Sequence, residues 1–180
     1  DLTDKVSEWE LTYYYNPTVC KVDDFPSSVW SLSLTHEQIE ILGEDSSRFE
    51  SLKSIYIEPQ YSNERTIDLT PLTAFELETL DVSDHRLSFV NDVLPEGLTA
   101  IYLSKEMFLK FQNKLPKSLK YLSLRGYQLT EIPECVFNLP NLIGLDLSGN
   151  NLTSLPDKLF LLTQLQRLDL SGNDLDDLAV

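Results

Sequence analysis

The chain has 180 residues, 42% of them hydrophobic, and a formal net charge of −15 at pH 7. Nucleic-acid-binding domains are basic and anionic membrane surfaces repel acidic chains, so this charge argues against both partners. No run of about 18 apolar residues occurs, so we expect no membrane insertion. The length favours a single elongated domain covering residues 1–180.

One apolar pattern recurs along the chain. Its clearest copies, starting at Leu142 and Leu165, both read Leu-x-x-Leu-x-Leu-x-x-Asn-x-Leu. We call the fourth residue of the pattern the anchor; an apolar residue lies three before and two after every anchor. The eight anchors, 21–25 residues apart, are Trp9, Leu32, Ile55, Leu80, Ile101, Leu122, Leu145 and Leu168. A repeat of this length and spacing is typical of a leucine-rich-repeat solenoid.

Strand geometry explains the spacing. The anchor and the residue two after it point to the same face of a short strand, because side chains alternate along a strand. Each coil buries that face against its neighbours. We therefore predict an α/β fold of about eight repeats: a curved right-handed coil with a parallel concave sheet and an irregular or short-helix convex side.

Local signals place further elements along the chain. Thr35–Leu42 is predicted to be a short helix capped by Thr35, with Gln38 three residues later. Lys105–Lys114 and Pro156–Leu162 are expected to form one or two helical turns each. Four prolines approach expected strands, where their fixed backbone angle favours an extended chain: Pro26, Pro95, Pro116 and Pro140.

The asparagine position, five residues after the anchor, is filled by asparagine only in the last two coils, at Asn150 and Asn173. Such an asparagine is expected to bond backbone groups of adjacent coils. Upstream, Gln60 and His85 are expected to make similar hydrogen bonds. The other upstream residues at this position are not expected to do so: Tyr14, Glu37, Glu106 and Tyr127.

The two cysteines, Cys20 and Cys135, fall in the first and sixth coils and are expected to lie too far apart for a disulfide. This cysteine usage favours a reducing, cytoplasmic location, so Asn151–Thr153 is interpreted as part of the repeat rather than as a glycosylation site. The chain begins at Asp1 rather than Met, with no visible signal peptide, which leaves open whether it is a fragment.

The concave face is the candidate binding surface. Polar positions beside the anchors are predicted to point into the hollow, including the position three after the anchor: Thr12, Thr35, Glu58, Ser83, Ser104, Arg125, Ser148 and Ser171. Tyrosine and arginine are enriched at binding hot spots, although strand propensity alone also favours tyrosine. The candidate partner-binding residues are Tyr56, Glu58, Asp81, Tyr102, Tyr121, Arg125, Asp146, Arg167 and Asp169.

No catalytic residue, metal site or cofactor is predicted. The two histidines, His36 and His85, lack a metal-ligand spacing with the cysteines, and the recurring Ser-Gly-Asn is the repeat turn rather than a phosphate loop. Residues 105–125 carry six bases and one acid. They form either a solvated edge or a basic patch for an acidic partner.

The final coils, from Ile132 through Leu175, resemble cytosolic leucine-rich repeats of the Ras-suppressor and scaffold type. The Leu-Pro-x-x-Leu segments, Leu94–Leu98 and Leu115–Leu119, resemble repeats of effectors that bacterial pathogens inject into host cells. Both resemblances imply protein binding in a cytosol, which for the effector type is a host cytosol after secretion, without catalysis by the repeats.

The leading hypothesis is a non-enzymatic protein-interaction module that binds a partner on its concave face. Two alternatives stay open: a recognition arm of a larger bacterial effector or signalling enzyme whose catalytic part lies outside this chain, or an acidic binder of basic proteins. An exposed end coil could also pair with a second copy to form a homodimer.

Overall fold

A computed structural model describes residues 27–44, 46–58, 65–83, 87–89, 91 and 93–175. The expected first anchor Trp9, and with it Cys20, lies outside the described residues. Seven strands form one parallel sheet in the order β1-β2-β4-β6-β7-β8-β9. Their bounds are β1 Ser31–Leu34, β2 Ser54–Ile57, β4 Thr79–Val82, β6 Ala100–Leu103, β7 Tyr121–Ser123, β8 Gly144–Asp146 and β9 Arg167–Asp169.

The sheet register places the seven described anchors opposite one another. Leu32 pairs with Ile55, Ile55 with Leu80 and Leu80 with Ile101. The register continues through Leu122 and Leu145 to Leu168. Each coil therefore adds one strand beside the preceding one, and the predicted repeat solenoid with a parallel sheet is confirmed.

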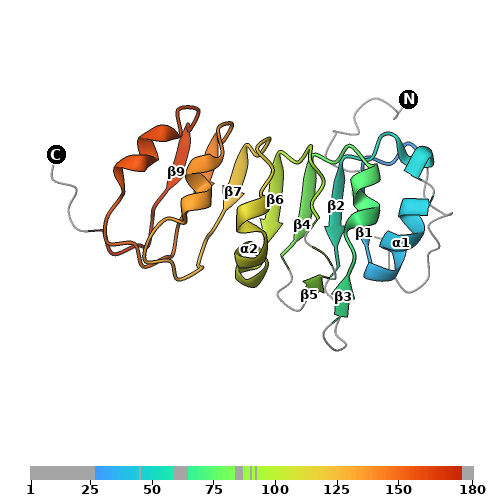
Figure 1. The fold of residues 1–180 in the computed structure, drawn as a ribbon, viewed down its shortest axis with the longest axis horizontal. Coiled ribbons are helices and arrows are strands. Elements are labelled where there is room, and N and C mark those ends of the chain that lie inside the picture. The colour runs from blue at the N-terminus through green and yellow to red at the C-terminus, as the bar shows by residue number, and fades with distance from the viewer. Residues whose placement is uncertain are drawn as a thin grey trace, which may run out of the picture.

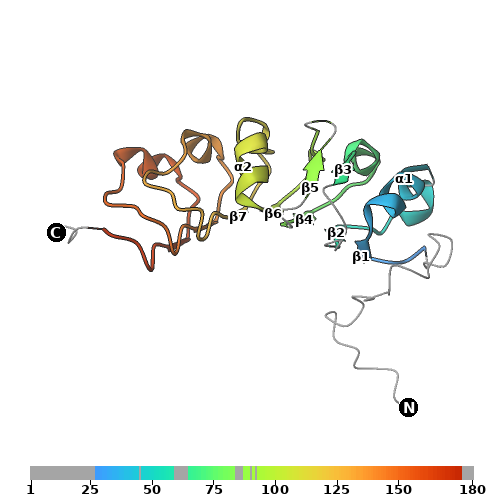
Figure 2. The same ribbon diagram turned by 90° about the horizontal axis from the view of Figure 1, so that it is seen from below.

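The other elements lie on the opposite side of each coil from the sheet (Figures 1 and 2). In Figure 2 the strands follow the inner side of a shallow arc and the helical segments its outer side. A second, two-stranded parallel sheet joins β3 (Arg65–Ile67) and β5 (Leu87–Phe89) on that outer side. The helical segments are α1 His36–Glu44, η2 Ser46–Phe49, η3 Thr70–Ala74, α2 Lys105–Phe111, η4 Gln112–Lys114, η5 Glu134–Asn138 and η6 Asp157–Leu161.

The three expected helical segments are present. The backbone N–H of Thr35 donates to Gln38 Oε1 at 2.9 Å at the start of α1, which is half of a capping box. Ser104 caps α2 by accepting from the backbone N–H of Met107 at 3.3 Å. The segment Pro156–Leu162 contains only the 3₁₀ helix η6.

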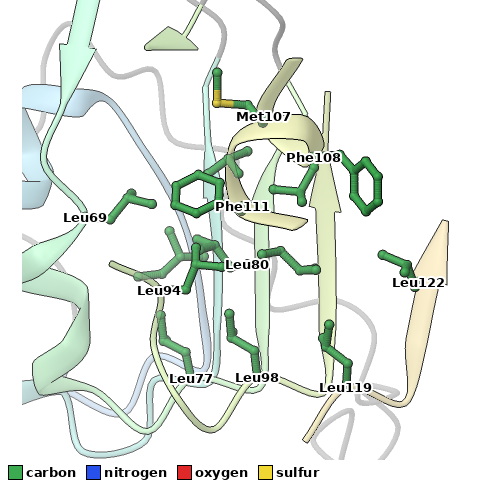
Figure 3. Close-up of a cluster of buried hydrophobic side chains, with 14 of the residues drawn as sticks. Leu69, Leu77, Leu80, Leu94, Leu98, Met107, Phe108, Phe111, Leu119 and Leu122 are labelled. Atoms are coloured by element: carbon green, nitrogen blue, oxygen red, sulfur yellow. The ribbon is translucent and has the colours of Figure 1, made fainter. Parts of the chain in front are cut away.

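One continuous core runs between the sheet and the outer segments. Residues three before successive anchors line up in a row, seen for Leu77, Leu98 and Leu119 in Figure 3. All three are at most 1% exposed, and so are Phe108 and Phe111 of α2, which cover the same coils from outside. Burying such side chains contributes about 1.5–3 kcal/mol each and offsets the conformational entropy lost in ordering the coils.

The two asparagines at the turn position hold neighbouring coils together. Asn150 Nδ2 donates to the carbonyls of Leu124 and Leu147 at 2.9 and 2.8 Å, and its Oδ1 accepts from the Leu129 N–H at 3.0 Å. Asn173 repeats this arrangement one coil later, with the Leu147 and Leu170 carbonyls and the Leu152 N–H. These bonds satisfy backbone groups that the tight turn leaves without partners.

The prediction that Tyr127 cannot replace such an asparagine is wrong. Its hydroxyl donates to the Leu103 carbonyl at 2.6 Å, and Leu103 occupies the same repeat position as Leu124 and Leu147, the carbonyls that the asparagines bond. Tyr127 also follows Gly126, whose φ of 71° matches the left-handed turn at Gly149, with φ 65°. Glu37 and Glu106 instead lie within α1 and α2, where a helix replaces the turn. Gln60, His85 and Tyr14 lie outside the described residues.

Replacing Tyr127 with phenylalanine should destabilise the fold by about 1–2 kcal/mol, because the buried Leu103 carbonyl loses its donor while the ring packing is kept. The ring stays against Phe108, 5.9 Å away between centroids. Urea unfolding at pH 7 measures the loss, with Tyr102→Phe as the control at an exposed tyrosine. Equal stabilities of the two variants would contradict the role of the hydroxyl.

The same variant changes the response to alkali. Burial, with a smaller contribution from the charge of Glu106, raises the pKa of Tyr127 to about 12, above the ordinary value of 10.0. Between pH 10 and 12 the Tyr127 hydroxyl therefore keeps its proton in the folded state and loses it in the unfolded state. The contribution of Tyr127 to the free energy of unfolding is complete below pH 10 and declines between pH 10 and 12. We expect the decline in unfolding free energy over that window to be shallower in Tyr127→Phe.

Candidate protein-binding face

The sheet presents two half-exposed tyrosines on adjacent strands. Tyr102 of β6 is 46% exposed and Tyr121 of β7 is 47% exposed. They border a shallow hollow of about 210 Å³ that also includes Ser123, Gly144 and Asp146. Large aromatic surfaces beside a hollow offer contact area with little loss of side-chain entropy on binding.

Gly144 sets the position of the Tyr121 ring. The two residues pair directly in the β7–β8 register. A β-carbon at position 144 would lie 2.9 Å from Tyr121 Cδ1, closer than real contacts allow. The ring therefore lies over the space that a side chain on the next strand would otherwise fill, and both residues line the hollow.

The aspartates just after the anchors lie at or next to the ends of their strands. Asp81, Asp146 and Asp169 each accept a hydrogen bond from the backbone N–H two residues later, at 2.9–3.0 Å. Asp146 additionally accepts from the hydroxyls of Ser148 at 2.6 Å and Ser123 at 3.2 Å. The structure thus orients the Asp146 carboxylate toward the turn at one side of the hollow.

The remaining charged candidates spread over several coils. Arg125 and Arg167 are exposed, as is Asp169. The Ser171 hydroxyl and backbone N–H hold the pKa of Asp169 below its usual range, and the positive charge of Arg125 adds to this. Towards the other end of the sheet, Tyr56 is half-buried and Glu58 accepts a hydrogen bond from the Ser33 hydroxyl at 2.6 Å.

The structure therefore brings together only part of the candidate set. Tyr102, Tyr121 and Asp146 surround one hollow. Tyr56 lies on β2, Glu58 directly follows it and Asp81 lies on β4. Arg125 follows β7, and Arg167 and Asp169 lie on β9. The sequence reasoning did not select Gly144 or Ser123, because neither residue type marks a hot spot. Their place beside Tyr121 and Asp146 in the repeat register could have identified both residues.

The prediction that every residue three after an anchor faces the concave side of the sheet is wrong. Thr35, Ser104 and Ser148 are only 5%, 7% and 4% exposed. Thr35 and Ser104 directly precede helices α1 and α2, and the Ser104 hydroxyl accepts from the Met107 N–H at the start of α2. The Ser148 hydroxyl donates to Asp146. Ser33, expected to be outward-facing just after its anchor, is likewise buried.

In the described ranges, no group of three or more His, Cys, Asp or Glu side chains could hold a metal ion. In the same part of the chain, no helix is both long and apolar enough to cross a membrane.

Comparisons with known proteins agree with this architecture. A family model described as "Leucine rich repeat" matches residues 117–175. Mouse (Mus musculus) lumican is 30% identical over 142 residues, which cover 76% of this chain and 42% of lumican. A solved leucine-rich-repeat protein of Leptospira interrogans has a TM-score of 0.51 and 18% identity, and the match covers 82% of this chain and 44% of that one.

The chain is a leucine-rich-repeat solenoid, and its residues 117–175 match the family model. It spans less than half the length of both of these proteins. Leucine-rich-repeat proteins generally mediate protein–protein interactions, and relatives such as these are typically non-enzymatic.

Proposed function

We propose that this chain is a non-enzymatic protein-binding module that docks a partner protein on the open face of its sheet. The observation that carries the proposal is the pair of half-exposed tyrosines, Tyr102 and Tyr121, beside the hollow over Gly144. Scattered exposed apolar residues are common, but two adjacent aromatic rings at a hollow are the kind of anchor on which binding energy concentrates.

Charged residues of both signs form a polar rim around the two tyrosines. Asp146 lies at the hollow, Arg125 follows β7, and Arg167 and Asp169 lie on β9. Rim charges of both signs steer the approach of a partner and restrict its orientation more than they add affinity. The aromatic centre should therefore determine how tightly the partner is held, and the rim which partner is accepted.

The first stage of the test identifies the partner by proximity. A photoreactive phenylalanine analogue at position 102 should crosslink a protein that the same analogue at position 109 does not. Leu109 is a matched control, because it is 53% exposed but lies on α2, on the opposite side of the coil.

The second stage measures that partner's affinity by calorimetry. The double variant Tyr102→Ala/Tyr121→Ala should lose at least about tenfold in Kd, since truncating hot-spot aromatics costs more than about 1 kcal/mol each. Gly144→Ala, whose new β-carbon forces the Tyr121 ring to move, should show a smaller loss in the same direction. If the double variant binds as tightly as Leu109→Ala does, the sheet face is not the docking site.

A further inference from the structure

A larger hollow lies away from the tyrosines, at the edge where the strands begin. It measures about 760 Å³ and is formed by segments just before three successive strands: Lys53 before β2, residues 73–78 before β4 and residues 93–97 before β6. We call this site the edge groove. None of the residues that line it lines the hollow between Tyr102 and Tyr121.

Apolar residues form part of the lining of the edge groove. Among them Phe75, Leu77 and Leu94 are largely buried, at 8%, 1% and 9% exposure. Val93 at its wall is 41% exposed, which is high for an aliphatic side chain beside a core. Gly97 adds no side chain and so leaves the groove open. An apolar side chain from another molecule would find contacts here that water cannot provide.

The rim of the edge groove carries unbalanced negative charge. Lys53 Nζ lies 3.2 Å from Glu76 Oε2 and also donates to the Glu76 carbonyl, so these two charges offset each other. Glu78 and Glu96 also line the groove and are exposed. Neither carboxylate makes an ion pair with any residue in the described part of the chain.

A second hollow of about 460 Å³ adjoins the first. It shares Phe75 and Glu76 with the edge groove and continues past Ala74 to Phe49 and Glu50. Two adjoining hollows that share an aromatic residue and carry acidic rims suit an extended chain better than a compact small molecule. The lining residues come from successive coils, so an extended chain lying across the coils would contact each of them in turn.

We propose that the edge groove binds an extended basic segment of another protein. An apolar side chain of that segment enters between Phe75 and Val93, and flanking lysine or arginine side chains face Glu78 and Glu96. Charge complementarity selects this occupant: the groove's two unpaired charges are both negative, so an acidic or neutral segment would leave them without a counter-charge. The site is independent of the sheet face, and either can fail without the other.

The probe is a fluorescein-labelled peptide, Gly-Gly-Lys-Leu-Lys-Leu-Lys-Gly-Gly, titrated with the purified chain at about 0.1 M salt, where charges beyond about 10 Å are screened. Two further peptides carry glutamate in place of lysine or glycine in place of leucine. The lysine–leucine peptide should bind most tightly by anisotropy. The double variant Glu78→Lys/Glu96→Lys should weaken it by about tenfold, because two attractions become two repulsions.

Matched variants separate the groove from the general acidity of the chain. Glu131→Lys/Asp174→Lys makes the same change in net charge at two exposed positions outside the groove, and should bind within about twofold of wild type because of screening. Val93→Ser should weaken the leucine peptide but not its glycine counterpart. All variants should keep the wild-type Tm, because the substituted side chains are exposed.

Three results would overturn the proposal. They are equal binding of the lysine and glutamate peptides, equal affinities of the groove and control charge variants, and loss of peptide binding in Tyr102→Ala/Tyr121→Ala. The last result would place the peptide on the sheet face, whereas a negative crosslinking result at position 102 leaves the groove measurement unaffected.

Discussion

Phe108→Ala should destabilise the chain by about 3–5 kcal/mol, the largest effect expected of any substitution considered for this molecule. Phe108 is 0% exposed, lies on α2, and packs on Tyr127 with ring centroids 5.9 Å apart. Removing the ring leaves a cavity between two coils and frees Tyr127, whose hydroxyl bonds the Leu103 carbonyl. Urea unfolding followed by circular dichroism measures the loss.

Leu109→Ala is the matched control, one residue further along α2. It is 53% exposed and should cost less than about 1 kcal/mol. If both variants unfold at the same urea concentration, α2 does not close the core over β6 and β7. In that case the sheet would be stable without the packing of the outer segments against it.

Asn150→Ala should cost about 3 kcal/mol, since three backbone groups lose a buried partner at about 1 kcal/mol or more each. The affected groups are the Leu124 and Leu147 carbonyls and the Leu129 N–H. Because these groups belong to two coils, the loss should be concentrated there rather than spread along the solenoid. Hydrogen exchange at the Leu129 amide should accelerate together with the fall in unfolding free energy.

The neighbouring exposed asparagine provides the control for this substitution. Asn151→Ala leaves the backbone bond from residue 151 to the Leu129 carbonyl in place and should change stability by less than about 0.5 kcal/mol. Comparable losses in the two variants would mean that the amide of Asn150 contributes no more than a surface side chain.

The position and register of the strands could be predicted from the sequence. An apolar residue at the anchor and another two later must share a strand face, and the spacing of 21–25 residues between anchors requires one coil per strand. The start of α1 was also predictable, because the signal of Thr35 followed by Gln38 is local. The tyrosines Tyr102 and Tyr121 could be selected as outward-facing by the same alternation.

Contacts between coils depended on the tertiary structure. Tyr127 takes over the asparagine's bond because its longer side chain reaches the Leu103 carbonyl while its ring rests on Phe108, and no property of a single coil reveals this. The same holds for Gly144, whose meaning comes from the Tyr121 ring on the adjacent strand.

The sequence by itself thus determined which apolar side chains face the core along each coil, because their burial follows the local period of the backbone. Only the tertiary structure decided which outward residues meet. The edge groove brings together Lys53, Glu78 and Glu96. In the chain, Glu78 follows Lys53 by 25 residues and Glu96 follows Glu78 by 18. Their proximity depends on how closely the coils stack and how the intervening outer segments pack, and neither quantity is written in a repeat of 21–25 residues.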